Sequence, residues 1–160
     1  MKNEQILLLI GEIREGLAML DKIHNLYLAY VPAFDDLEKR EIRDAVLLTE
    51  VLCNSYTCLE TIFFRISRLF ENNLPADKWH KELLQKMRIE VPNIRKAVLS
   101  SESYLLLDEL RRFRHFKRYY FEFDYDWNRL SYLRIVYEKA FVLISEELEF
   151  YIGFLTELTD

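Results

Sequence analysis

The sequence predicts an all-α fold: an antiparallel bundle of four long helices and one short helix. Hydrophobic residues make up 51% of the 160 residues, whereas glycine and proline occur three times each, so the chain has little of the turn chemistry that a many-stranded β fold needs. Apolar residues also recur at the spacing of amphipathic helices along most of the chain. A chain of this length is expected to form a single domain, residues 1–160, around one core.

The first half of the chain predicts two long helices that meet near a proline. Regular apolar spacing predicts a helix over about 3–30, which Val31-Pro32 interrupts because a proline disfavours the α conformation in the residue before it. A second helix is expected over about 36–71, with Asp35 or Asp36 as its N-cap. The later half of this helix is apolar on more than one side, which favours contact with several neighbours or with another subunit.

The middle of the chain predicts a short helix followed by a connection. The short helix is expected over about 78–87, with Asp77 as its N-cap. The breaker residues ENNLP precede it, and Pro92 and the stretch VLSSES follow it.

The last part of the chain predicts two further long helices. One is expected over about 102–123, with Ser101 or Ser103 as its N-cap. A brief break at FDYDW separates it from the last helix, which Asp124 or Asp126 caps and which reaches about residue 158. Short connections of this kind favour an up-and-down bundle.

Composition and charge narrow the classes of function. The formal net charge of -5 argues against a general nucleic-acid binder, although one local basic patch exists from Arg111 to Arg118. Cys53 and Cys58 lie in a helix-like stretch where their side chains diverge, so neither a disulfide nor a zinc site is expected. No apolar run reaches the roughly 20 residues of a membrane span, and no signal-peptide cleavage pattern is found, so we expect a cytoplasmic protein without a membrane partner.

One helix concentrates the groups that can do chemistry. On a helical wheel at about 100° per residue, the segment LDELRRFRHFKRYYFEFDYD separates into an aromatic face and a cationic face. The aromatic face, expected to join the core, consists of Phe113, Phe116, Tyr120 and, towards one edge, Phe123. The opposite face consists of Arg111, Arg114, His115, Arg118 and Glu122.

The arginines on this face need a partner. Like charges three and four positions apart destabilise an isolated helix by roughly a few tenths of a kcal/mol per pair. One explanation is pairing with acidic residues that are close in sequence, namely Asp108, Glu109 and Glu122. The other explanation is an anionic ligand, because the planar guanidinium group binds phosphate through two hydrogen bonds.

The same segment resembles a known family. The string DELRRFRHFKRYYFEFD, residues 108–124, resembles the signature of HepT-like proteins in the HEPN superfamily. The resemblance extends upstream through LPADKWHKELLQKM, IEVPNIRKAVLS and the helix around LETIFFRI, so that it covers roughly residue 47 to the C-terminus. It implies a HEPN-like helical bundle and a ribonuclease toxin that uses no metal and no cofactor. It also implies a homodimer, with the motif helices facing each other across a composite cleft, and a nucleotidyltransferase-type antitoxin as partner.

The family motif differs from this sequence at two positions. The motif is an arginine, a polar residue, a few variable residues and a histidine, often followed two positions later by a tyrosine. Carried onto this chain, these positions are Arg114, His115, Tyr119 and Phe121. A tyrosine phenol ordinarily loses its proton only near pH of about 10, so Tyr119 is a poor base at neutral pH. Phe121 lacks the hydroxyl that some partner nucleotidyltransferases of this family modify.

These residues define the expected site. Its catalytic part consists of Arg114, His115 and Tyr119, with His115 as the group that transfers protons, because histidine exchanges protons near neutral pH. The resemblance implies that the arginine and the proton-transfer group help the RNA 2′-hydroxyl attack the adjacent phosphate. Arg111 and Arg118 are expected to bind phosphate beside them. The expected substrate is the single-stranded part of a structured RNA such as tRNA.

Two other interpretations remain open from the sequence. Tyr119 and Phe121 favour a catalytically degenerate HEPN protein, a dimeric module that binds a partner protein, RNA or nucleotide without cleaving it. The third interpretation is a purely structural bundle. It requires that carboxylates of the chain pair with every arginine of the cationic face.

Overall fold

The described part of the chain is helical. The computed structural model describes residues 3–71, 79–120 and 122–159. Its helices are α1 (Asn3–Asp35), α2 (Ile42–Phe70), α3 (Trp79–Met87), α4 (Ser101–Tyr119) and α5 (Trp127–Glu157). No β-sheet occurs among these residues, so the predicted all-α class with four long helices and a short one is confirmed.

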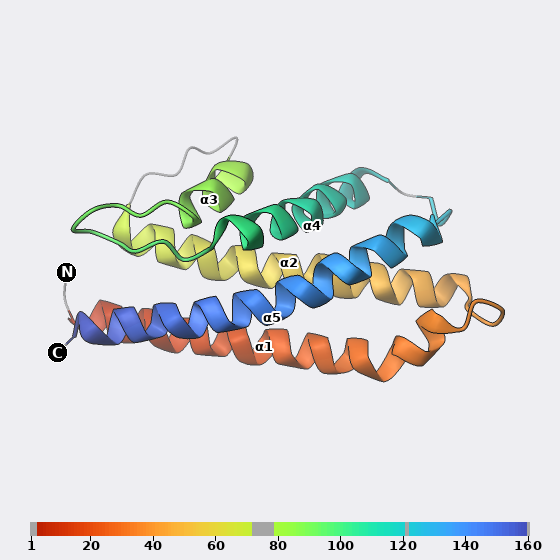
Figure 1. The fold of residues 1–160 in the computed structure, drawn as a ribbon, viewed down its shortest axis with the longest axis horizontal. Helices are drawn as coiled ribbons and strands as arrows, with labels where there is room; N and C mark the ends of the chain where they lie inside the picture. The colour runs from red at the N-terminus through yellow and green to blue at the C-terminus, as the bar shows by residue number, and fades with distance from the viewer. Residues whose placement is uncertain (1–2, 72–78, 121, 160) are drawn as a thin grey trace.

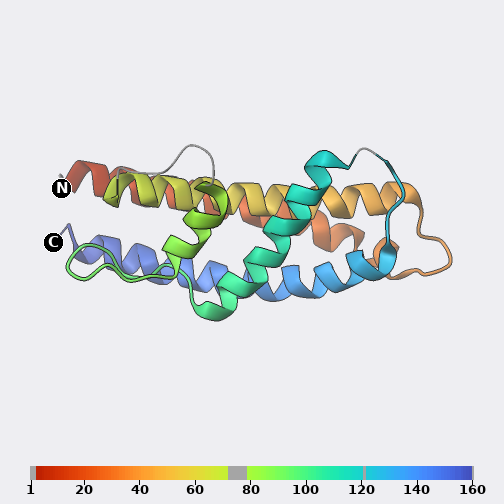
Figure 2. The same cartoon turned by 90° about the horizontal axis from the view of Figure 1, so that it is seen from above.

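The four long helices run up and down in chain order (Figure 1). α1 and α2 form an antiparallel pair, and α5 returns beside α1, so that both termini lie at one end of the bundle. α2 packs against each of the other helices and therefore forms the centre of the bundle. α4 crosses the bundle obliquely, beginning beside α5 and ending over α2 (Figure 2). This crossing brings the C-terminal half of α4 onto α2.

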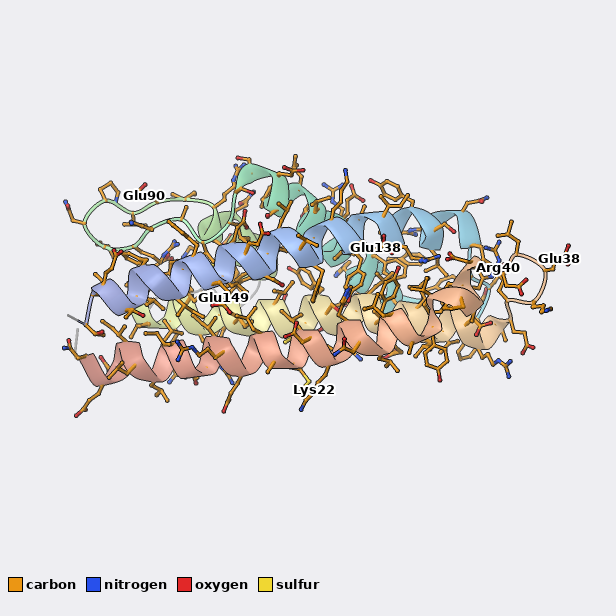
Figure 3. All side chains as sticks on the ribbon, turned by 60° about the horizontal axis from the view of Figure 1, so that its bottom comes forward. Lys22, Glu38, Arg40, Glu90, Glu138 and Glu149 are labelled. Carbon is orange, nitrogen blue, oxygen red and sulfur yellow. The ribbon has the colours of Figure 1, made fainter. Side chains whose placement is uncertain are left out.

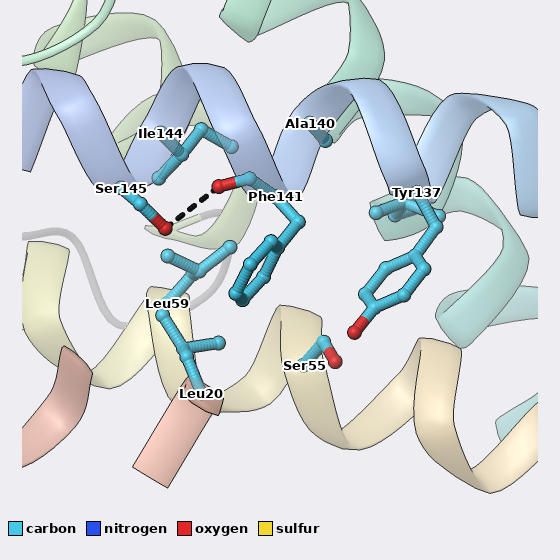
Figure 4. A pocket seen from close by; sticks show the side chains of 9 residues that line it. Leu20, Ser55, Leu59, Tyr137, Ala140, Phe141, Ile144 and Ser145 are labelled. Carbon is cyan, nitrogen blue, oxygen red and sulfur yellow. Dashed lines mark hydrogen bonds between the residues drawn. The ribbon is translucent and has the colours of Figure 1, made fainter. Parts of the chain in front are cut away.

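The core between these helices is closely filled. A cavity of about 10 Å³ lies beside Ser55, Tyr137 and Phe141 (Figure 4). This volume is about what one water molecule needs, so the cavity is too small for an organic ligand. Within the described residues, none of the helices combines the length and the apolar composition that crossing a membrane requires.

The boundary between α1 and α2 differs from the prediction. α1 continues through Pro32 to Asp35, because Pro32 still accepts a hydrogen bond from the Asp36 backbone N–H at 3.2 Å. Proline removes one donor from the helix but keeps its acceptor, and the C-terminal end of α1 bends in Figure 1. The predicted interruption at Val31-Pro32 is therefore wrong.

α2 also begins later than predicted. The Asp36 carboxylate accepts hydrogen bonds from the Glu38 and Lys39 backbone N–H groups, so it stabilises the turn after α1 and does not cap α2. The N-cap of α2 is Glu41, which forms a reciprocal capping box with Asp44.

Residues of the turn between α1 and α2 also contact α5. The Arg40 guanidinium lies over the Trp127 ring, 4.4 Å from the ring centroid. Figure 3 labels Arg40 in this turn. Such a cation–π contact contributes on the order of 0.5–1 kcal/mol at an exposed site. It joins the end of the α1–α2 pair to the start of α5.

The other boundaries follow the sequence more closely. α3 ends at Met87 as predicted, whereas Asp77, its expected cap, lies outside the described residues. The cap of α4 is Ser100 and neither Ser101 nor Ser103, and α4 ends at Tyr119, short of the predicted residue 123. Asp126, one of the two caps considered, does cap α5 through the Asn128 and Arg129 backbone N–H groups.

α1 and α2 approach closely at Gly16, which gives a prediction for stability. A Cβ atom there would lie 2.5 Å from Cδ1 of Ile62, a side chain that is only 1% exposed. Gly16→Ala should therefore lower the free energy of unfolding by about 1–3 kcal/mol, because overpacking outweighs the gain in helix propensity. Gly11→Ala is the matched control, since a Cβ there meets nothing within 4 Å, and it should stabilise by about 0.5–1 kcal/mol. Urea unfolding measures both, and stabilisation by Gly16→Ala would contradict the close approach.

His24 of α1 joins α5 in a contact that depends on pH. Its ring stacks on Phe141 with the centroids 3.7 Å apart, and its Nδ1 lies 3.1 Å from the Tyr137 hydroxyl. Burial lowers the pKa of His24 below its ordinary value of 6.5, and the charges of Asp21 and Glu138 oppose this shift. The folded protein thus favours the neutral imidazole.

The lowered pKa of His24 predicts how stability changes with pH. The unfolded chain binds a proton at His24 more readily than the folded protein, so this contribution to stability is lost as the pH falls through 6.5 towards the lower pKa of the folded state. Between neutral and mildly acidic pH, the free energy of unfolding should fall more for the wild type than for His24→Gln, which cannot titrate. Urea unfolding at both pH values tests this prediction. An equal fall in the free energy of unfolding for the wild type and for His24→Gln would refute it.

Candidate functional site

The N-terminal half of α4 is firmly attached to the bundle. The Ser100 hydroxyl accepts a hydrogen bond from the Ser103 backbone N–H at 3.1 Å. The Ser100 backbone N–H in turn donates to the Glu147 carboxylate of α5, also at 3.1 Å. The inner face of α4 is buried as far as Phe113. The residues that follow Phe113 therefore occupy defined positions relative to α2 and α5.

The aromatic face of α4 is only partly core. Phe113 is 4% exposed, as predicted, but Phe116 is 42% and Phe123 is 62% exposed. The prediction is wrong for Phe116 because α4 crosses the bundle obliquely, so its last turns extend beyond the core. It is wrong for Phe123 because the helix ends at Tyr119, and Tyr120 already has extended backbone angles.

Arg114 points towards α2. Its Nη2 donates to both carboxylate oxygens of Glu60 at 2.8 and 2.9 Å, and its Nη1 donates to the Thr57 hydroxyl at 3.2 Å. Its guanidinium carbon also lies 5.0 Å from the centroid of the Tyr56 ring. The side chains of Arg114 and Glu60 are 14% and 7% exposed, so this ion pair is largely shielded from water. Burial raises the pKa of Tyr56, and Glu60 raises it further.

Sequence reasoning did not identify Glu60 and Thr57 as partners of Arg114. They lie on a different helix, more than fifty positions earlier in the chain. One signal was present: Glu60 follows Tyr56 by four positions and precedes Phe63 by three, which places a carboxylate within an apolar stripe. A charged group in such a stripe needs a partner of opposite charge.

Arg111 and Arg112 share one carboxylate on their own helix. Asp108 accepts a hydrogen bond from Nε of Arg111 at 2.8 Å, and it forms ion pairs with Nη2 of Arg111 at 2.8 Å and with Nη2 of Arg112 at 2.6 Å. The Asp108 side chain is 9% exposed and Arg111 is 17% exposed. The explanation by acidic neighbours therefore holds for Asp108 and Arg111, and the charge of Arg111 is offset locally.

His115, Arg118 and Tyr119 face the solvent. All three are exposed, and Tyr119 is 66% exposed. The rings of His115 and Tyr119 meet edge to face with their centroids 5.2 Å apart. Across the ranges that the structure describes, no hydrogen bond or ion pair involves Arg118. The purely structural interpretation requires a carboxylate partner for every arginine of the cationic face. Arg111 and Arg114 have such a partner, but among the described residues Arg118 does not.

The arrangement divides the expected site into two parts. Arg111 and Arg114 are held by carboxylates, whereas His115, Tyr119 and Arg118 form an accessible surface with an imidazole, a phenol and a guanidinium. These three groups can exchange a proton and bind an anion. Cys53 is no nucleophile at neutral pH, because burial and the charge of Glu50 raise its pKa to about 11. No cluster of three metal-ligating side chains is found in the described residues.

The ion pair between Arg114 and Glu60 gives a second prediction for stability. Removing one partner of a shielded pair leaves the other charge without its counterion, so Glu60→Ala and Arg114→Ala should each lower the free energy of unfolding by about 3 kcal/mol. The double variant should cost less than the sum of the two. Arg112→Ala is the matched control, because its side chain is 64% exposed. Urea unfolding measures the stability of the four variants against the wild type. A loss of stability in the double variant equal to the sum of the two single losses would show that the pair is not coupled.

A comparison of the sequence with models of known protein families finds a match, and the matched region contains the site. A family model described as HepT-like protein matches residues 47–155, which include the site helix α4 and its partner residues on α2. The match begins where the resemblance of the sequence begins. No curated protein and no solved structure matches the chain. Because the family model covers more than half of its length, the chain belongs to the HepT-like protein family.

Proposed function

We propose that this protein is a HepT-like toxin: a metal-independent endoribonuclease of a toxin–antitoxin pair that acts on structured RNA such as tRNA. The observation that carries the proposal is the exposed imidazole of His115, which lies edge to face with Tyr119 on the arginine-rich helix α4. Membership of the HepT-like family supports the proposal, because the matched residues 47–155 include this helix.

The proposed reaction uses the RNA as its own nucleophile. His115 takes the proton from a 2′-hydroxyl, whose oxygen then attacks the adjacent phosphorus. The bond between phosphorus and the 5′ oxygen breaks, and the leaving oxygen receives a proton. The products are a 2′,3′-cyclic phosphate and a 5′-hydroxyl end. An imidazole suits this reaction because it both accepts and donates protons near neutral pH.

The arginines would have different roles in this reaction. Arg118 is exposed and is the arginine best placed to contact a phosphate oxygen and to stabilise the charge that develops on it. Arg114, held by Glu60 and Thr57, positions the helix and lies at the base of the site. Arg111, whose charge Asp108 offsets, would contribute to the position of the helix rather than to binding the phosphate. Tyr119 orients the imidazole of His115 through their ring contact.

The proposal includes two partners. A homodimer would bring the α4 helices of two subunits together and supply a second His115, so that one imidazole acts as the base and the other as the acid. A nucleotidyltransferase-type antitoxin would silence the toxin, as the family relationship suggests. We place this activity in the cytoplasm, where its RNA substrate occurs.

The proposal predicts RNA cleavage that depends on His115. Purified wild-type protein should cut total RNA in the presence of EDTA, and His115→Ala should slow cleavage by about a hundredfold or more, the usual contribution of a general acid–base group. Arg118→Ala should also slow cleavage, because it removes a phosphate contact. Arg43→Ala is the matched control: this arginine pairs with Glu41 at the start of α2 and should leave cleavage unchanged.

RNA electrophoresis and mapping of the cut ends measure these effects. The ribonuclease proposal fails if wild-type protein leaves the RNA intact, or if His115→Ala and Arg43→Ala cut it equally well. Circular dichroism of each variant separates a lost catalytic group from a lost fold.

A second candidate function is a HEPN module that binds RNA, a nucleotide or a partner protein without cleavage. Two observations favour it: Tyr119 occupies the expected histidine position, and Glu60 already offsets the charge of Arg114. This candidate expects salt-sensitive binding that weakens in Arg118→Ala, while the RNA stays intact. Tyr119→His would then restore the family motif. If this variant cleaves RNA and the wild type does not, the protein is a degenerate nuclease.

A further inference from the structure

A pocket opens on the side of α4 that faces α5. Its volume is about 210 Å³, and it lies between the C-terminal end of α4 and the first turn of α5. Phe113 and Leu130 are buried and form its floor. Phe116, Tyr120 and Tyr125 are partly or largely exposed and form its walls. Four of the nine residues that line the pocket are therefore aromatic.

The rings and cations of this pocket are arranged in layers. The rings of Phe116 and Tyr120 stack with their centroids 5.0 Å apart and an angle of 23° between their planes. The Arg129 guanidinium carbon lies 4.6 Å from the Phe116 centroid, and Lys117 Nζ lies 4.7 Å from the Tyr125 centroid. Proteins bind the bases of single-stranded nucleic acids with such combinations of aromatic faces, guanidinium planes and cations.

The charges around the pocket favour a neutral ligand with a polar edge. Lys117 and Arg129 form no ion pair within the described part of the chain, so both can donate hydrogen bonds. Asp124 and Asp126 also line the pocket, and Asp126 is engaged in capping α5. Two cations and two carboxylates leave the pocket close to neutral. Carboxylates repel a free phosphate but accept hydrogen bonds from the amino groups of bases.

The size of the pocket restricts the ligand further. Pockets that enclose whole small molecules measure roughly 300–1,000 Å³, so 210 Å³ suits one ring system and not a complete cofactor. A planar aromatic ring with hydrogen-bonding groups at its edge meets the conditions of size, stacking and charge. A nucleobase is such a ring.

We propose that this pocket binds one unpaired nucleobase of the RNA and thereby determines where the strand lies on α4. The inference rests on the proposed function, because its ligand is the RNA bound by that site. Phe116 directly follows His115, and Lys117 directly precedes Arg118, so the base pocket and the phosphate-binding surface lie on opposite faces of the same turns of α4. An α-helix with its side chains is only about 10 Å across, so a strand with one base in the pocket can reach His115 and Arg118 by passing around α4.

Binding of RNA that cannot be cleaved tests the pocket. The probes are short fluorescein-labelled 2′-O-methyl homopolymers of each of the four bases, together with an abasic strand of the same length. Fluorescence anisotropy should show that wild-type protein binds at least one homopolymer about tenfold more tightly than the abasic strand, as expected for one stacked base. Phe116→Leu should lose this difference and keep its affinity for the abasic strand. Leucine retains apolar contact, and Phe116 is 42% exposed, so the fold should persist.

Two further variants complete the test. Tyr125→Leu removes a second ring of the pocket and should also lose the preference for a base. Phe150→Leu is the matched control, since this exposed phenylalanine lies elsewhere on α5 and should keep the preference. The inference is overturned if wild-type protein shows no preference for bases, or if Phe116→Leu and Tyr125→Leu retain it.

The outcome is independent of catalysis, because a 2′-O-methyl group cannot attack phosphate. A preference for bases that depends on Phe116, combined with intact total RNA in the cleavage assay, would leave the pocket established and the ribonuclease proposal refuted. Cleavage of total RNA without any such preference would refute the pocket and leave the ribonuclease proposal standing.

Discussion

The ion pair between Arg114 and Glu60 is the constraint on which the geometry of the site depends. Removing two charges from water is costly, and the pair recovers this cost through two hydrogen bonds between one nitrogen and both carboxylate oxygens, with the Tyr56 ring beside them. α2 contacts every other helix of the bundle, so the pair ties α4 to the central element of the fold. It thereby sets the rotation of α4. With Arg114 turned inwards, His115 is turned towards the solvent, whereas Arg118 is exposed because it lies one turn further along α4, where the helix extends beyond the core.

This rotation gives the last turns of α4 two distinct accessible faces. On one face, His115, Tyr119 and Arg118 present an imidazole, a phenol and a cation whose charge no described carboxylate offsets. On the other, Phe116 and Lys117 meet α5 around an aromatic pocket. The first face has the chemistry for a phosphate and the second has the chemistry for a base. The RNA site that we propose for this protein, whose formal net charge is -5, rests on this combination of a phosphate-binding face and a base-binding face.

Much of the fold could be predicted from local pattern, and the errors have physical causes. Helical periodicity located the long helices, because burial of one face repeats along them, and breaker and capping residues located the short helix α3. The start of α2 was misplaced because Asp36 has the side chain of an N-cap but uses it in a turn. The end of α4 was misplaced because a helical wheel assumes that the helix continues. The arginine-rich helix and its exposed histidine were also predictable, since they lie within one short segment. The partner of Arg114 was not, because Glu60 becomes its neighbour only through the packing of α4 on α2.

The arginine pairs also bear on the choice between a nuclease and a binding module. Arg114 occupies the arginine position of the family motif, but its charge is offset in this subunit by Glu60, and that of Arg111 is offset by Asp108. A group whose charge is already compensated contributes mainly position, so in the proposed ribonuclease Arg118 would stabilise the developing phosphate charge. His115 would transfer the proton, because it supplies the imidazole of the site. The difference between the two proposed functions is therefore concentrated in His115, whereas Arg118, the ion pairs and the aromatic pocket would serve either function.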